Sequence, residues 1–160
     1  MPPNLYLVRH AEAEHNIKCR FHIPDPILTP KGRTECRNLR KTFPHHNKID
    51  LILPSPHSRA IQTTLFAFSN TLARLEVPYI LVPNAQEVST KPCDTGLSID
   101  VLMAVEIPKL FKDEGLSFGT EKIGIDLMED EWNLKKGFYA LDPEAVQVRA
   151  DALRARLYGL

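Results

Sequence analysis

The sequence has few of the features that mark extracellular or membrane proteins. Its three cysteines, Cys19, Cys36 and Cys93, are odd in number and widely spaced, so they form neither a disulfide framework nor a zinc-ligand pattern. The apolar runs are too short to cross a bilayer, and the first residues lack the charged and apolar regions of a signal peptide. We therefore expect reduced thiols, a cytoplasmic location and no contact with membranes.

An excess of charge of one sign is also absent, because 20 lysines and arginines balance 20 aspartates and glutamates. No basic run is interleaved with aromatic residues, so nucleic acid is not an expected partner. The balance hides an asymmetry, with a net charge of +5 up to Thr63 and −5 from Thr64 onward. This asymmetry is compatible with an uneven distribution of no functional meaning, or with positive potential that gathers a small anion.

The chain of 160 residues, 43% apolar and 25% charged, has the length and composition of one globular domain. Short β-rich runs at Asn4–Val8, Asp50–Pro54 and Val77–Val82 are predicted strands, and helical patterns separate them. This alternation indicates an α/β domain with a mostly parallel sheet.

Four helices are predicted from capping residues and periodicity. One begins at Thr29-Pro30 and ends near Phe43, since a hydroxyl can cap a helix and proline suits its first position. Residues 55–75 show the clearest helical period, with an apolar face formed by Ile61, Leu65, Phe68, Leu72 and Leu75. Residues 99–111 and 143–157 complete the set, and Arg149 is assigned to the charged face of the last helix. The acidic residues 112–140 are interpreted as an inserted or lid-like segment.

Polar residues follow the first two predicted strands, where ligands bind in parallel sheets. Arg9 and His10 end the first strand, Asn16 lies in the following loop, and Arg59 opens the helix after the second strand. Arginine matches phosphate oxygens with its planar fork, and a helix N-terminus adds free N–H groups. A neutral imidazole can attack phosphorus and carry the phosphoryl group. This pattern predicts a phosphate pocket.

Three motifs occur in a fixed order: Leu7–Glu12 (Leu-Val-Arg-His-Ala-Glu) followed by Asn16, then Leu28–Gly32 (Leu-Thr-Pro-Lys-Gly), then Ser55–Thr63 (Ser-Pro-His-Ser-Arg-Ala-Ile-Gln-Thr). Together they resemble the signature of the histidine phosphatase superfamily, also called phosphoglycerate mutase-like. Pro92–Gly96 is also similar to a stretch in uncharacterised fungal members of that family. The resemblance covers most of the chain, densely up to residue 96 and thinly beyond.

The resemblance implies a three-layer α/β/α sandwich with phosphatase activity. The implied substrate is a small phosphorylated metabolite, a phosphomonoester that is hydrolysed through a phosphohistidine on His10. It implies that Arg9 and Arg59 hold the phosphoryl oxygens, with Asn16 close to them. Glu87 matches the acid that protonates the leaving alcohol. No metal ion or organic cofactor is implied.

The resemblance leaves three alternatives open. Asp94 is a second candidate for the acid if its loop is displaced. The second step could also return the phosphoryl group to a sugar acid, as in a mutase. An alternative of another class is a non-catalytic phosphate-binding or interaction module.

That last alternative is supported by a departure from the family pattern. Members carry a further pocket histidine on a late strand, whereas the last histidine here is His57. Relative to the family, we therefore expect the chain to be truncated at its C-terminal end, with the last strand or strands missing. A missing strand leaves a sheet edge unpaired, and loss of one transition-state donor costs about 10²–10³ in rate. We expect this form to be weakly active or inactive.

Overall fold

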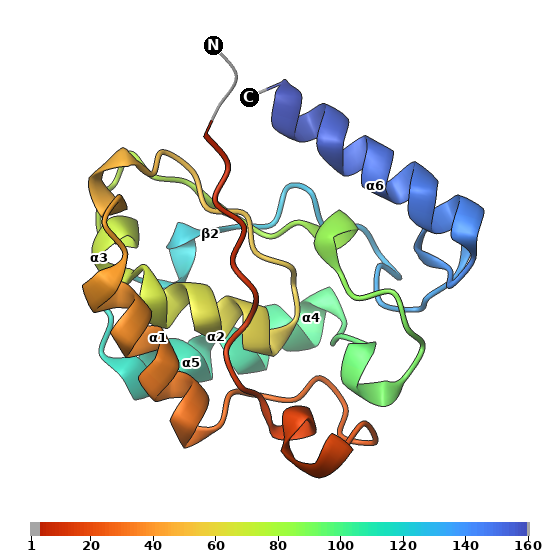
Figure 1. Cartoon of the computed structure of the whole chain (residues 1–160), viewed down its shortest axis with the longest axis horizontal. Coiled ribbons are helices and arrows are strands. Elements are labelled where there is room, and N and C mark those ends of the chain that lie inside the picture. Colours follow the sequence, from red (N-terminus) through yellow and green to blue (C-terminus); the bar gives the residue numbers. More distant parts are fainter. Residues whose placement is uncertain (1–3, 160) are drawn as a thin grey trace.

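Two packed helices organise the first half of the chain, as the ribbon in Figure 1 shows. The structure is a computed structural model and describes residues 4–159. α1 (Pro30–Thr42) begins as predicted, because Oγ1 of Thr29 accepts a hydrogen bond from the Gly32 N–H at 3.0 Å. α2 (Ser58–Ala67) packs along α1 and carries Arg59 in its first turn.

The helix predicted over residues 55–75 is interrupted. α2 ends before Phe68, whose backbone leaves the helical region, and α3 (Ser69–Leu72) follows as a single turn. Four of the five residues of the predicted apolar face are buried in the core: Ile61, Leu65, Phe68 and Leu72. The prediction was wrong for Leu75, which is 94% exposed because it lies beyond the end of α3.

The chain also forms a small parallel sheet. β1 (Tyr79–Ile80) pairs in parallel with β2 (Ile123–Gly124), and Ile52 forms a parallel bridge to Tyr79 on the other side of β1. The α/β class is therefore confirmed. The wide sheet of the predicted three-layer sandwich is not formed within residues 4–159, where the predicted strands at 50–54 and 77–82 shrink to one bridge and two residues.

The prediction of a buried first strand at Asn4–Val8 was wrong. No backbone hydrogen bond joins this segment to another part of the chain that the structure describes, and Leu7 is 94% exposed. A β-rich sequence becomes a strand only when a neighbouring strand pairs with it. Here the segment is extended and runs across the front of Figure 1 towards His10.

The helix predicted at 99–111 is confirmed as three consecutive helical pieces. α4 (Ile99–Val101) leads into a π-helical turn (Leu102–Glu106) and then into α5 (Ile107–Glu114). Pro108 has no N–H to donate, and its ring conflicts with the carbonyl one turn earlier. The wider π-helical turn lies where proline would otherwise break the helix.

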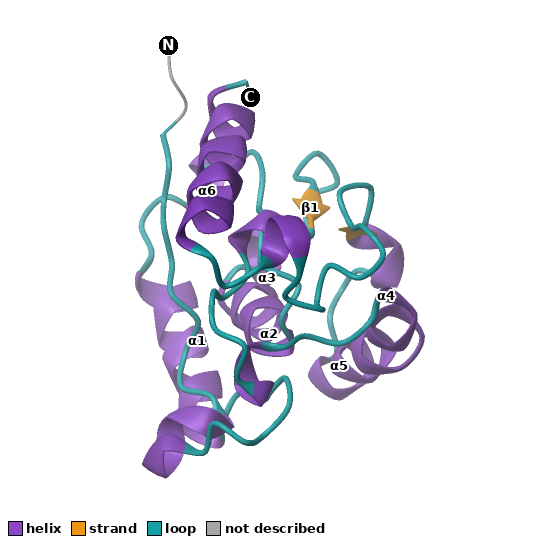
Figure 2. Cartoon of the chain, turned by 90° about the vertical axis from the view of Figure 1, so that its right-hand side faces the viewer, coloured by secondary structure: helices purple, strands orange, loops and turns teal. Residues whose placement is uncertain are grey.

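α6 (Pro143–Tyr158) follows the predicted range closely and lies at the edge of the molecule, at the upper right of Figure 1 and on the side facing the viewer in Figure 2. Its orientation differs from the one predicted. Arg149, assigned to the charged outer face, is buried, whereas Val148 is exposed. The guanidinium of Arg149 is directed inward because its Nη2 donates to the carbonyl of Gln86 at 3.3 Å.

Short helical turns fill most of the remaining loops: Glu14–Cys19, His46–Lys48, Pro83–Ala85, Pro92–Asp94, Thr120–Lys122 and Gly137–Tyr139. Residues 112–140 contribute β2 and bury Trp132, whose ring leaves no room for a side chain at Gly96. Within residues 4–159, every helix is too short or too polar to span a bilayer.

Candidate active site

The loop that carries His10 is fixed by residues of the other two sequence motifs. The N–H of Ala11 donates to Oγ1 of Thr63 on α2 at 3.1 Å, and the N–H of Thr29 donates to the Glu12 carbonyl at 3.0 Å. At Gly32, an added Cβ would lie 2.0 Å from that same carbonyl. The absence of a side chain at Gly32 therefore lets the first turn of α1 approach the loop, which explains the glycine of the second motif.

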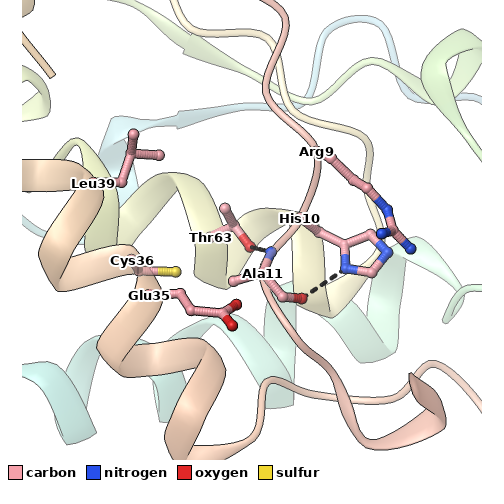
Figure 3. A pocket seen from close by; sticks show the side chains of 7 residues that line it. All are labelled: Arg9, His10, Ala11, Glu35, Cys36, Leu39 and Thr63. Carbon is pink, nitrogen blue, oxygen red and sulfur yellow. Dashed lines mark hydrogen bonds between the residues drawn. The ribbon is translucent and has the colours of Figure 1, made fainter.

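The imidazole of His10 is held in one tautomer. Its Nδ1 lies 2.8 Å from the carbonyl oxygen of Ala11, which can only accept, so Nδ1 carries the proton and Nε2 keeps a free lone pair. Burial lowers the pKa of His10, and the charges of Arg59 and Arg9 lower it further, against the opposing hydrogen bond to Ala11. The ring is therefore neutral and nucleophilic at neutral pH. In Figure 3, the side chains of Arg9 and His10 extend to the same side of the backbone, away from α1.

Arg59 is the buried cation of the site, with 1% of its surface exposed. Its Nη1 donates to the carbonyl of Cys93 at 2.6 Å. Its Nη2 reaches two carboxylates, Oδ1 of Asp94 at 3.1 Å and Oε1 of Glu87 at 3.3 Å. The guanidinium is thus oriented by residues 87–94, a loop that follows neither of the first two predicted strands directly.

The two carboxylates beside Arg59 differ in environment. Burial alone would raise the pKa of Asp94, but a hydrogen bond from the Ser89 hydroxyl at 2.5 Å and the charge of Arg59 outweigh it and lower that pKa. Asp94 is therefore ionised at neutral pH. The side chain of Glu87 is 48% exposed, and its carboxylate bonds only Arg59 among the described residues.

Arg9 and Asn16 border the same hollow as His10. A pocket of about 270 Å³ is lined by Arg9, His10, Glu12, Asn16 and Glu35. The overlapping hollow in Figure 3 extends between Ala11 and α1. The structure therefore brings Arg9, Arg59 and Glu87 within electrostatic reach of His10 and places Asn16 at the border. Within residues 4–159, no three histidine, cysteine, aspartate or glutamate side chains cluster closely enough to hold a metal ion.

Three further residues at the site are not among the predicted site residues. Asp25 accepts hydrogen bonds from the backbone N–H and hydroxyl of Ser58, at 3.1 and 2.6 Å, and fixes the start of α2; burial raises its pKa to about 6. Lys135 donates to Oε1 of Gln86 at 2.7 Å and to the Glu87 carbonyl. Burial, with the charge of Arg149, lowers the pKa of Lys135 to about 8. The third residue is His15, whose ring lies beside that of His10.

Comparisons with known proteins fit this arrangement. A protein of Schizosaccharomyces pombe named as a probable phosphatase is 29% identical over 97 residues, which are 58% of this chain and 44% of that protein. A candidate phosphoserine phosphatase of Hydrogenobacter thermophilus is 45% identical over 62 residues, covering 38% of this chain and 30% of that protein. A phosphoglycerate mutase-like protein of Arabidopsis thaliana is 32% identical over 117 residues, covering 64% and 42%.

The matched part of the chain therefore covers less than half the length of each of these relatives. No solved structure gives a significant match. Residues 5–106, which include His10, Arg59 and Glu87, match the profile of the histidine phosphatase superfamily, branch 1. This match extends over more than half of the sequence, and the chain therefore belongs to the histidine phosphatase superfamily.

Proposed function

We propose that this chain is a phosphatase that hydrolyses a small phosphomonoester through a phosphohistidine on His10. The observation that carries the proposal is the tautomer of His10. Because its Nδ1–H is bound to the Ala11 carbonyl at 2.8 Å, the free lone pair lies on Nε2, at the far side of the ring. The buried Arg59 and the exposed Arg9 both act electrostatically on this ring.

The proposed reaction has two displacements at phosphorus. Arg59 and Arg9 hold the phosphoryl oxygens, Nε2 of His10 forms a bond to phosphorus, and the bond to the substrate alcohol breaks. Glu87 gives its proton to the departing oxygen. Water then attacks the phosphohistidine, its proton passes to the Glu87 carboxylate, and the broken P–N bond releases inorganic phosphate.

Glu87 is the preferred acid in this scheme. Asp94 is less suited to this role, because its pKa is lowered and its carboxylate is ionised at neutral pH. Asp94 instead supports Arg59, to which it is bound at 3.1 Å. The more exposed Glu87 side chain is free to turn from Arg59 towards a leaving group.

The proposal extends to two features of the architecture. The strands of the three-layer α/β/α sandwich that the family implies are mostly parallel, and the parallel pairing of Ile52, β1 and β2 agrees with that direction. The contact of Lys135 with the Glu87 carbonyl supports a covering role for residues 112–140, because it ties that segment to the site.

One observation favours the alternative of a non-catalytic phosphate-binding module. The Nη2 atom of Arg59 is already paired with two carboxylates, so an incoming phosphate must compete with them. A protein that only binds phosphate would show saturable binding with no release of alcohol.

The test is hydrolysis of p-nitrophenyl phosphate, phosphoserine and phosphoglycerate by the wild-type chain and by His10→Ala. We expect weak turnover by the wild type and none above background for His10→Ala. His22→Ala is the matched control, because His22 is an exposed histidine of the same loop, and it should retain wild-type turnover. Turnover that survives in His10→Ala would contradict the proposal, and binding without turnover would favour the module. Transfer to an alcohol instead of water would indicate a mutase.

A further inference from the structure

His15 is buried in a loop whose neighbouring residues are largely exposed. Only 6% of its surface is accessible, although it belongs to the short turn Glu14–Cys19. Its ring centroid lies 5.5 Å from that of His10. Burying an imidazole is unfavourable unless its two nitrogen atoms find partners.

The hydrogen bonds around Asn16 fix the tautomer of His15. The N–H of Ala13 donates to Oδ1 of Asn16 at 2.9 Å, so the other amide atom, Nδ2, faces His15. Nδ2 lies 3.2 Å from Nε2 of His15 and can only donate, which makes Nε2 an acceptor. In the neutral ring, the proton therefore sits on Nδ1.

The Nδ1–H group of His15 has no hydrogen-bond partner among the described residues, although it is buried. The charges of Arg59, His10, Asp94 and Glu87 all act on this ring, so it belongs to the same cluster as the candidate catalytic groups. A buried donor without an acceptor is uncommon in folded proteins and calls for an explanation. An oxygen atom of a ligand in this cluster would supply the missing acceptor.

The other imidazole near the site does not have this freedom. Nδ1 of His57 lies 3.1 Å from the Ser55 hydroxyl, and its Nε2 lies 3.1 Å from the carbonyl oxygen of Asp94. Both ring nitrogens of His57 therefore have hydrogen-bond partners within the protein. Among the described residues, His15 is therefore the imidazole beside His10 whose ring N–H has no partner in the protein.

We propose that His15 is a phosphate-binding residue, which donates its Nδ1–H to an oxygen of the phosphoryl group held between His10 and Arg59. This inference rests on the proposed function, since it takes the ligand to be a phosphoryl group. Asn16 acts through His15: its amide keeps the proton on Nδ1 and so presents a donor to the ligand.

Two substitutions separate this role from a structural one. In His15→Asn, the side-chain NH₂ stands where Nδ1 stood and keeps the donor. In His15→Gln, the amide oxygen stands near the position of Nε2 and keeps the bond from Asn16, but the donor at the δ position is lost. A ligand-binding role predicts that His15→Asn preserves phosphate affinity, whereas a purely structural role predicts that His15→Gln does.

The measurement is the Kd for inorganic phosphate by isothermal titration calorimetry, with thermal unfolding of both variants to establish that they fold. We expect His15→Gln to bind phosphate roughly 10- to 100-fold more weakly than the wild type, as for loss of a hydrogen bond to a charged group. His15→Asn should remain within a few-fold of the wild type. Equal affinities in both variants, or rescue by His15→Gln instead of His15→Asn, would overturn the inference.

The same samples distinguish this inference from the proposed function. Phosphate affinity that depends on His15, in a wild-type chain that never forms phosphohistidine, would leave the inference standing and overturn the catalytic proposal. Phosphohistidine on His10 in a chain whose phosphate affinity does not respond to His15→Gln would overturn the inference alone.

Discussion

Nη2 of Arg59 donates a hydrogen bond to Oδ1 of Asp94 at 3.1 Å. The arginine to which we assign phosphate binding is therefore already paired with a carboxylate. Burial makes this pairing necessary, because an unpaired guanidinium with 1% exposure would be costly. The same pairing opposes the entry of an anionic substrate. The pairing with Asp94 thus stabilises and orients the buried Arg59 side chain, but it weakens the binding of phosphate.

Asp94→Asn should therefore tighten phosphate binding. The amide oxygen can still accept from Arg59, while one negative charge beside the phosphate is removed, and we expect the Kd for inorganic phosphate to fall by roughly tenfold. Calorimetric titration measures it. Asp100→Asn, at an exposed position of α4, is the control and should leave the Kd unchanged. Weaker binding by Asp94→Asn would show that Asp94 helps the phosphate rather than opposing it.

Glu87→Gln should reveal the general acid through the leaving group. Loss of the proton donor is expected to slow hydrolysis of an alkyl phosphate such as glycerol phosphate by about 10²–10⁴. Hydrolysis of p-nitrophenyl phosphate should fall much less, because nitrophenolate leaves without protonation. Steady-state rates on the two substrates check this. If Asp94→Asn produced this selectivity and Glu87→Gln did not, the assignment of the acid would be reversed.

The activity should persist into mildly acidic solution. The nucleophile must be neutral, and burial together with Arg59 and Arg9 places the pKa of His10 below its ordinary value of 6.5. As the pH falls, kcat/KM should therefore begin to decline only below pH 6.5. Arg9→Gln removes one of the charges that lower this pKa, so the decline should start at a higher pH. Arg20→Gln, at an exposed arginine, should leave the profile unchanged. An acid limb above 6.5 in the wild type would contradict this account of the His10 environment.

Gly32→Ala should destabilise the chain and disturb the site together. A Cβ at this position would lie 2.0 Å from the Glu12 carbonyl, so either α1 or the His10 loop must move. We expect a loss of about 1–3 kcal/mol in the free energy of unfolding, measured in urea. Gly159→Ala, where the nearest atoms lie 3.6 Å from the added carbon, should be close to neutral. Equal stability of the two variants would mean that the approach of α1 to the loop is not tight.

Local signals in the sequence were sufficient for the helices. Thr29 caps α1, and Pro30 stands at its first position, because capping depends on a few adjacent residues. The apolar period also predicted which face of α2 is buried. The wrong prediction of a strand at Asn4–Val8 shows the limit of local signals, since a strand depends on a partner elsewhere in the chain. Arg149 shows the same limit, because the Gln86 carbonyl that draws it inward is distant in sequence.

The candidate site was predictable where motifs carry it. His10, Arg9 and Arg59 follow predicted strands, and the structure brings them together. The burial of His15 was not predictable, because it depends on the amide of Asn16 and on the folding of the loop around it. Lys135 lies 48 residues from Glu87, whose carbonyl it contacts, and no local pattern indicates such a pairing.

The central claim is that Nε2 of His10 takes up the phosphoryl group. The most direct test is rapid quenching of the wild-type chain during reaction with p-nitrophenyl phosphate, followed by peptide mapping by mass spectrometry. The account predicts an acid-labile, base-stable phosphoryl group on the peptide that contains His10, and its absence in His10→Ala. Release of nitrophenol with no phosphoryl group on His10 at any quench time would contradict it.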